Sequence, residues 1–280
     1  MRKRLPSWLT KKPPSGKDFQ KVVKILENSK TFTVCREAKC PNRFECFSKK
    51  TATFLALGNF CTRSCKFCNI LHKKNPKPPD PNEPEQIAKA VSDMKLQHVV
   101  ITMVTRDDLI DGGAKHLATI IDQIRNFNKN ITIEILTSDF NGKFENLEIV
   151  LNKNVDIFNH NIETVSSLTP KIRNKATYLT SLEILNFSKK SKKSRFVKSG
   201  FMVGLGEKED EIFQTIRDLA NIDLDILTIG QYLQPNLNKY PVIDYIHPEK
   251  FKKYKIFAQS LNIPKVLSSP FVRSSYNSCI

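Results

Sequence analysis

No hydrophobic run in the sequence is long enough to cross a membrane. The most apolar stretches, such as HVVITMV at 98–104, fall far short of the roughly 20 residues that a transmembrane helix needs. The amino-terminal stretch MRKRLPSWLT is basic, but Pro6 and the polar residues that follow leave it without the apolar core of a signal peptide. We therefore expect a cytoplasmic protein without a membrane partner.

Acidic residues are scarce beside basic ones. The 280-residue chain has 45 Lys and Arg against 28 Asp and Glu, which gives a formal net charge of +17. Residues 1–50 hold 14 of the basic and 4 of the acidic residues, and KKSKKSR at 189–195 holds five more cations. This balance is typical of a lysine-rich solvated surface, or of a protein that binds nucleic acid or an acidic protein. Charge alone does not decide between these interpretations.

The chain lacks the features of a small disulfide-stapled protein, although it has seven cysteines. It is too long and too rich in apolar residues for such a scaffold, and it shows no secretion signal. Clustered cysteines in such a chain indicate metal ligands. Six lie within 34 residues, namely Cys35, Cys40, Cys46, Cys61, Cys65 and Cys68, and the seventh, Cys279, is expected to be a free thiol.

Short apolar segments alternate with amphipathic helical patterns from residue 51 onward. The predicted strands are 51–58, 98–104, 131–136, 155–163, 197–206 and 225–233. The predicted helices, of which the first precedes the alternation, are 18–29, 85–96, 116–127, 178–190, 210–221 and 249–261. The pattern predicts an α/β fold, a parallel sheet with helices outside it, and six units favour a partial (β/α)6 barrel over a closed eight-stranded one. Polar residues follow the strands at their carboxyl ends, where β/α barrels carry their chemistry.

The loop CTRSCKFC at 61–68 has three cysteines and no fourth. It directly follows the first strand of the predicted barrel. Three thiolates can hold three irons of a [4Fe–4S] cluster and leave the fourth iron open to a small molecule, just as catalytic metal sites keep an open position. The alternative is a zinc site completed by His72. The position of the loop at the mouth of a β/α alternation favours the cluster.

This loop carries a family resemblance. Its C-x3-C-x2-C spacing, with Phe67 as the aromatic residue before the last cysteine, resembles the radical S-adenosylmethionine (SAM) superfamily. A second cysteine triplet in VCREAKCPNRFEC and the motif RSSY at 273–276 narrow the resemblance to the lipoyl synthase family, over about residues 5 to 276. The other segments that resemble the family are TRDDLIDGGA (105–114), NHNIET (159–164), SGFMVGLGE (199–207) and IGQYLQP (229–235).

The resemblance implies two [4Fe–4S] clusters, a radical cluster whose open iron chelates SAM and an auxiliary cluster. The implied ligands are Cys61, Cys65 and Cys68 for the radical cluster, and Cys35, Cys40, Cys46 and Ser275 for the auxiliary cluster. A serine oxygen is a hard donor that matches an iron–sulfur cluster poorly. The iron at Ser275 should therefore leave most readily and open a sulfide to attack. The implied division of the chain is an extension with the auxiliary cysteines (1–50), a radical SAM partial barrel (51–240) and an extension with RSSY (241–280).

Further residues near SAM are also implied by the resemblance, namely Phe67, Asn161, Glu163, Arg173, Gly204 and Glu207. The glycines of GLGE at 204–207 either permit close approach of the cofactor or form an ordinary turn from strand to helix. His160 is expected to be a buried structural histidine. Asp107 and Asp108 are expected to cap the following helix.

The implied activity is the insertion of two sulfur atoms at carbons six and eight of a protein-bound octanoyl-lysine, with the auxiliary cluster as sulfur donor. The implied partners are octanoylated lipoyl carrier domains (2-oxoacid dehydrogenase acyltransferase subunits and the glycine cleavage H protein), an electron donor such as flavodoxin or ferredoxin, and an iron–sulfur carrier for cluster repair. The positive charge would suit an acidic carrier. No nucleic-acid partner is expected. Two alternatives remain: a radical SAM tRNA-modifying, methylthio-transferring enzyme, for which the chain shows no RNA-binding module, and an electron carrier, which would need four cysteines per cluster.

Overall fold

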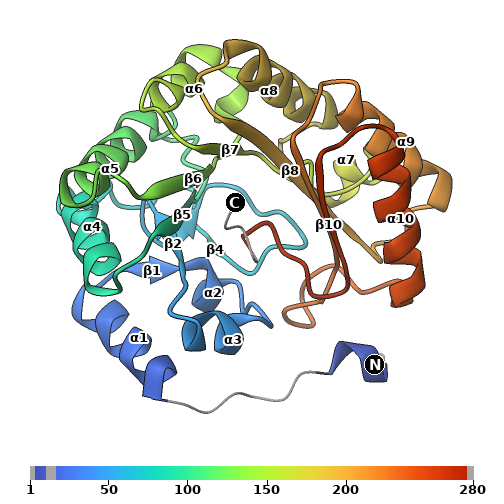
Figure 1. Ribbon diagram of the computed structural model, residues 1–280, viewed down its shortest axis with the longest axis horizontal. Coiled ribbons are helices and arrows are strands. Elements are labelled where there is room, and N and C mark those ends of the chain that lie inside the picture. The colour runs from blue at the N-terminus through green and yellow to red at the C-terminus, as the bar shows by residue number, and fades with distance from the viewer. Residues whose placement is uncertain (1–3, 11–16, 276–280) are drawn as a thin grey trace.

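A curved, mostly parallel sheet forms the centre of the computed structural model, which describes residues 4–10 and 17–275 (Figure 1). Its strands, in spatial order, are β1 (Phe32–Thr33), β2 (Thr53–Ala56), β5 (His98–Met103), β6 (Thr132–Leu136), β7 (Ile157–Asn159), β8 (Phe196–Val203), β9 (Ile226–Gln231) and β10 (Lys265–Ser268). Neighbouring strands pair in parallel, except that β1 is antiparallel to β2. Parallel pairing aligns the carboxyl ends of the strands at one edge of the sheet, which we call the mouth.

Helices cover the outside of this sheet, as Figure 1 shows. The longer ones are α1 (Lys17–Asn28), α4 (Glu83–Asp93), α5 (Ala114–Phe127), α6 (Phe144–Leu151), α8 (Tyr178–Ser191), α9 (Glu209–Ala220) and α10 (Pro248–Ser260). The short ones are α2 (Val34–Glu37), α3 (Arg43–Ser48), α7 (Thr169–Ile172) and the 3-10 turns Ser7–Leu9, Phe140–Gly142 and Ser166–Leu168. In α5, Leu117, Ile121 and Ile124 recur at helical spacing and are fully buried. A separate two-stranded sheet, β3 (Phe60–Cys61) with β4 (Leu71–His72), flanks the loop of cysteines.

The predicted barrel is confirmed, and the sheet is wider than predicted. All six predicted strands are present, and β1 and β10 extend the sheet to eight strands. Both extra strands are short, and the apolar pattern of KVLS in β10 is too brief to signal a strand. The stretch from Cys35 to Cys46, expected to be irregular, contains α2 and α3.

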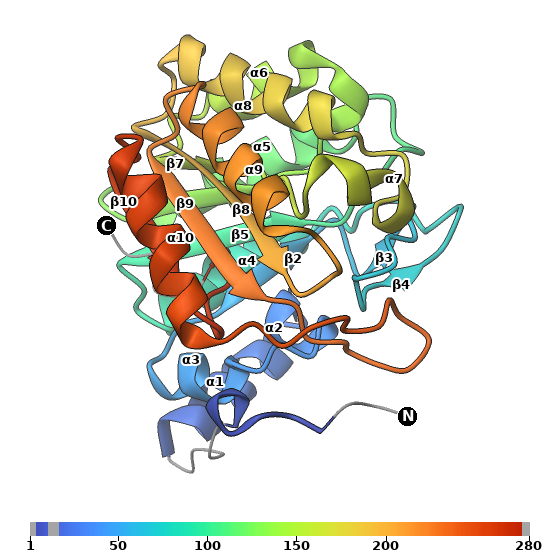
Figure 2. The same cartoon turned by 90° about the vertical axis from the view of Figure 1, so that its right-hand side faces the viewer.

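The two extensions of the chain meet beside the barrel. Figures 1 and 2 show α1–α3 near β2, and Figure 1 shows the segment after β10 turning toward the centre of the curved sheet. The side-chain amide of Asn42 donates a hydrogen bond of 2.7 Å to the carbonyl of Phe271, which ties one extension to the other. Gly230 lets the second extension pass close to β9, because a Cβ atom there would lie 2.1 Å from the carbonyl of Val272. The boundaries 1–50, 51–240 and 241–280 stay a prediction.

No helix within 4–10 and 17–275 is both long and apolar enough to cross a membrane.

Candidate cluster and cofactor site

The loop of residues 61–68, called the radical cysteine segment below, lies at the mouth and is held there by backbone hydrogen bonds. The amide of Thr62 donates to the carbonyl of Thr105 (3.0 Å), just after β5. The amide of Lys66 donates to the carbonyl of Ile172 (2.8 Å), and its carbonyl accepts from Tyr240 (2.9 Å). Segments far apart in the sequence thus fix the path of the loop.

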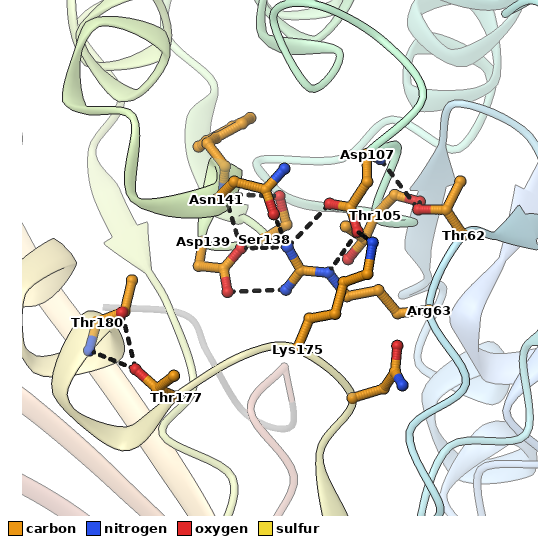
Figure 3. A network of polar contacts seen from close by, with 12 residues as sticks. Thr62, Arg63, Thr105, Asp107, Ser138, Asp139, Asn141, Lys175, Thr177 and Thr180 are labelled. Atoms are coloured by element: carbon orange, nitrogen blue, oxygen red, sulfur yellow. Dashed lines mark hydrogen bonds and ion pairs between the residues drawn. The ribbon is translucent and has the colours of Figure 1, made fainter. Parts of the chain in front are cut away.

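One buried arginine fastens this segment to two strand ends (Figure 3). The guanidinium of Arg63 donates two hydrogen bonds to Asp107 after β5 (both 2.9 Å) and two to Asp139 after β6 (both 2.7 Å). It donates a fifth to Asn141 Oδ1 (2.7 Å). Burial disfavours its charge, but the hydrogen bonds and charges of Asp139 and Asp107 outweigh burial and raise its pKa. The same bonds lower the pKa of both carboxyl groups against the effect of burial.

Arg63 is not among the site residues predicted from the sequence, and the prediction for Asp107 and Asp108 is wrong. Asp107 and Asp108 were expected to cap the next helix, but Asp107 pairs with Arg63 and Asp108 pairs with Arg106 (2.7 Å). The carboxylate that accepts amide hydrogens at the start of α5 belongs to Asp111. A sequence pattern does indicate this ion pairing. Arg63 lies between two cysteines, and Asp107 and Asp139 each follow a predicted strand.

The three cysteines of the radical segment are free thiols that influence one another electrostatically. Burial is the largest cause that raises the pKa of Cys68 to about 12, and the charges of Cys65 and Cys61 add to it. Burial also raises the pKa of Cys65. Because a cluster binds thiolates, loading these cysteines must release protons.

No mononuclear metal site is present in the described part of the chain, where no three His, Cys, Asp or Glu side chains lie close enough to share one ion. In a [4Fe–4S] cluster each thiolate binds a different iron, so its ligands stand further apart than those of a single ion. The three thiols of the radical segment act on one another electrostatically, which fits ligands of one cluster. The exposed His72, which was the fourth ligand in the zinc alternative, does not complete a site.

The second triplet lies in the segment of residues 35–46, called the auxiliary cysteine segment below. Cys35 is buried in α2, and burial, followed by the charges of Cys40 and Cys46, raises its pKa to about 12. The guanidinium of Arg273, from the RSSY motif, lies close enough to Cys40 for the two groups to interact electrostatically. The carboxyl-terminal extension with Ser275 therefore runs beside this triplet. Tyr276 of the motif and Cys279 lie outside the described residues.

The rate at which the thiol of Cys35 reacts with an alkylating reagent tests whether this cysteine is buried. At pH 8 a thiol with a pKa near 12 is only about one part in ten thousand thiolate, which is the reactive form. In the metal-free chain we expect iodoacetamide to modify the partly exposed Cys40 before the buried Cys35, as measured by peptide mass spectrometry over time. Equal rates at the two cysteines would contradict the burial of Cys35.

The proposed SAM contacts Asn161, Glu163 and Arg173 lie together beside the radical segment. Asn161 donates to Glu163 (3.2 Å), and the charges of Arg173 and Glu163 both act on the thiol of Cys65. Burial raises the pKa of Glu163, although Arg173 and Asn161 oppose it. Glu163 has a φ of 68°, a strained conformation for a residue other than glycine that is common at functional sites. Ser274 of the RSSY motif donates to Asn161 Oδ1 (2.9 Å), which joins the second extension to this group.

Gly204 and Glu207, which the resemblance also places near SAM, are engaged in contacts within the protein. The carboxylate of Glu207 accepts hydrogen bonds from the amides of Gly204 (2.5 Å) and Leu205 (2.9 Å). A Cβ atom on Gly204 would lie 2.2 Å from Gln231 and 2.4 Å from the carbonyl of Asp244, so close packing of the chain explains this glycine.

Phe67 and His160 make contacts within the protein. Phe67 packs, partly buried, against the core. His160 is buried between the carbonyl of Thr137 and the hydroxyl of Ser181, at 3.0 Å from each. Burial and the charge of Arg173 lower its pKa to about 4, as suits a neutral structural histidine.

Two family models match parts of this chain. The radical SAM superfamily model matches residues 55–219, and the model of the N-terminal domain of lipoyl synthase matches residues 1–40. Lipoyl synthase from Protochlamydia amoebophila (strain UWE25) is 52% identical over 276 residues, which is 98% of this chain and 85% of that protein. Lipoyl synthase from Alkaliphilus metalliredigens (strain QYMF) is 50% identical over 275 residues, 98% of this chain and 94% of that protein.

Solved structures with the same fold have much lower sequence identity to this chain. Methylornithine synthase (PylB) superposes with a TM-score of 0.58 at 15% identity, over 91% of this chain and 71% of that one. HydG, a maturase of the [FeFe]-hydrogenase, superposes with a TM-score of 0.61 at 14% sequence identity, over 88% of this chain and 62% of that one. At such identities the likeness shows the fold alone. The curated relatives, by contrast, are about half identical over nearly the whole chain, and the chain therefore belongs to the lipoyl synthase family of radical SAM enzymes.

Proposed function

We propose that this enzyme inserts sulfur at carbons six and eight of an octanoyl chain that is amide-linked to a lysine of a carrier protein. The observation that carries the proposal is that the chain has two separate triplets of cysteines outside any disulfide. One triplet lies at the mouth, and the other lies in the amino-terminal extension with the RSSY segment beside it. A radical enzyme without a sulfur source would need only the first triplet. Sulfur would come from a cluster on the second.

The two triplets have different roles in this proposal. A [4Fe–4S] cluster on Cys61, Cys65 and Cys68 would supply the electron that cleaves SAM to methionine and a 5′-deoxyadenosyl radical. Asn161, Glu163 and Arg173 would hold the polar groups of SAM beside Cys65. They offer donors and acceptors in a buried setting, where charged hydrogen bonds are strong.

Ser275 is assigned to the auxiliary site as a fourth ligand, beside Cys35, Cys40 and Cys46. An oxygen ligand suits an iron–sulfur cluster less well than a thiolate, so Ser275 would be the ligand that gives up its iron. The carrier substrates would be octanoylated lipoyl domains of 2-oxoacid dehydrogenases and the glycine cleavage H protein. A flavodoxin or ferredoxin would supply electrons, and an iron–sulfur carrier would rebuild the auxiliary site.

Product mass tests the proposal directly. The enzyme is reconstituted anaerobically and given SAM, reductant and an octanoylated lipoyl domain. We expect the domain to gain the mass of two sulfurs less two hydrogens, and no gain when SAM is left out. An unchanged domain, with SAM cleaved normally, would overturn the proposed function.

The positions of the cations limit where an acidic carrier can bind. The run at 189–195 lies before the amino end of β8, opposite the mouth, and two of its lysines pair with Asp225 (2.5 Å) and Glu148 (2.9 Å). By contrast, Lys73, Lys74 and Lys77 are exposed just after β4, beside the radical segment.

Two triple variants that remove the same number of positive charges test which group of cations the carrier protein contacts. We expect changing Lys73, Lys74 and Lys77 together to glutamine to slow carrier association several-fold at low salt, with the difference vanishing at high salt. The control replaces the exposed Lys190, Lys192 and Arg195 by glutamine, which removes the same charge from the opposite end. Equal slowing by both triple variants, measured by stopped-flow or surface binding, would contradict docking at the mouth.

A further inference from the structure

Asn69, which directly follows Cys68, joins the two cysteine segments. Its side-chain Nδ2 donates a hydrogen bond of 2.7 Å to the carbonyl of Glu37. Glu37 is the last residue of α2, between Cys35 and Cys40. A single side chain thus connects the backbone of the auxiliary segment to a residue adjacent to a ligand of the radical segment.

The orientation of this amide is fixed by a chain of donors and acceptors. The backbone amide of Asn238 donates to Asn236 Oδ1 (3.0 Å), which leaves the Nδ2 of Asn236 facing Asn69. That Nδ2 donates to Asn69 Oδ1 (2.8 Å), and Asn69 Nδ2 then faces the carbonyl of Glu37. A backbone amide can only donate and a carbonyl can only accept, so both ends of the chain dictate the same orientation. Aspartate at position 69 could accept from Asn236 but could not donate to Glu37.

We propose that Asn69 is a positioning residue that sets the separation of the auxiliary segment from the radical segment. The inference rests on the proposed function, in which a carbon that has lost hydrogen at one site must then reach sulfur at the other. Both sites must lie within reach of one bound octanoyl chain. A misplacement of 1 Å in such an arrangement can cost roughly a hundredfold in rate. The hydrogen bond from Asn69 to Glu37 connects the two segments, and the hydrogen bond from Asn236 holds the side chain of Asn69 in the orientation that this requires.

Three variants separate the two bonds of Asn69. Asn69→Ala removes both, Asn69→Asp keeps the bond from Asn236 and removes the one to Glu37, and Asn236→Ala does the reverse. We expect SAM cleavage to persist in all three. Sulfur insertion should fall roughly tenfold to a hundredfold in Asn69→Ala and Asn69→Asp, and less in Asn236→Ala. SAM would then be cleaved without sulfur insertion. The number of 5′-deoxyadenosine molecules formed per lipoyl group should therefore rise well above the two molecules that the reaction needs.

Hydrogen exchange gives a readout that does not depend on turnover. In the reconstituted enzyme we expect amides of residues 35–46 to exchange roughly fivefold faster in Asn69→Ala and Asn69→Asp than in the parent, as the loss of one hydrogen bond implies. Iron content should stay that of two clusters. The matched control is Asn130→Ala, an exposed asparagine in the loop before β6, which should change nothing.

Two results would overturn the role of Asn69. One is Asn69→Asp with the exchange rates and sulfur insertion of the parent, because the bond to Glu37 would then be dispensable. The other is loss of SAM cleavage in parallel with sulfur insertion, which would mean that Asn69 supports the radical site alone. A parent enzyme that cleaves SAM but inserts no sulfur would instead refute the proposed function, and the exchange data would still test the link between the segments.

Discussion

Replacing Ser275 with alanine should leave SAM cleavage intact and stop sulfur insertion. The radical segment lies at the mouth and is anchored by Thr105, Ile172 and Tyr240, none of which belongs to the RSSY segment. Loss of Ser275 removes a proposed ligand of the auxiliary site only. Sulfur insertion should fall by more than the roughly 10- to 100-fold that loss of an outer partner costs a metal site. The measurement is 5′-deoxyadenosine and lipoyl product from the same reaction.

Two neighbouring variants sharpen this prediction. Ser275→Cys supplies a fourth thiolate, a better match for iron, so iron should be retained more tightly while sulfur insertion still falls. Ser274→Ala loses the bond to Asn161 and should weaken SAM binding rather than stop sulfur insertion selectively. Persistent sulfur insertion in Ser275→Ala would show that the serine is not a ligand that the reaction needs.

Replacing Arg63 with alanine should prevent stable loading of the radical cluster. The side chains of Arg63 and Asp139 are each 4% exposed and that of Asp107 is 10% exposed. The variant therefore leaves the buried carboxylate of Asp139 without its cation, and leaves Asp107 with only the exposed Lys175 at 3.4 Å. Breaking a buried ion pair in this way costs about 3–5 kcal/mol. The loop would lose the attachment that Arg63 gives it to the end of β6, and at the end of β5 it would keep the hydrogen bonds of Thr62. Arg63→Lys should restore only part of the loading, because a single ammonium cannot bond in pairs with two carboxylates.

Iron content after reconstitution and the melting temperature of the metal-free chain together check this prediction. The control is Arg125→Ala, which breaks an ion pair with Asp156 at the opposite end of the barrel, where both side chains are about a quarter exposed. This control should lower the melting temperature and leave cluster loading unchanged. If Arg125→Ala and Arg63→Ala reduced the iron content equally, Arg63 would be acting on overall stability and not on the loop.

Strands and cysteines were predictable because their signals are local. The run HVVITM in β5 is mostly apolar and is buried after its first residue, and a near-continuous apolar run suits a strand covered on both faces. The thiol triplets are visible from spacing alone. By contrast, β10 has four residues and α2 has four, too few for a period to show.

The contacts that fix the site could not be predicted, because they join distant residues. Arg63 and Asp139 are 76 positions apart, and only the barrel brings the ends of β2, β5 and β6 together. Asn69 has no local pattern either, since its partners Glu37 and Asn236 come from opposite ends of the sequence. The resemblance supplied the ligand assignments, and the structure adds how the two segments are attached.

The hydrogen bond between Asn42 and Phe271 has a consequence for biosynthesis. Its two residues are separated by 229 positions, and the carboxyl-terminal one must leave the ribosome before the bond can form. A nascent chain that has completed its barrel strands up to β9 therefore still has an auxiliary triplet that is not covered by the segment after β10. The last backbone contact that holds the radical segment comes from Tyr240, which precedes Phe271 in the chain, so the auxiliary site is completed later in synthesis than the radical segment. On the proposed ligand assignment, the site that would make radicals is therefore completed before the site that would supply sulfur.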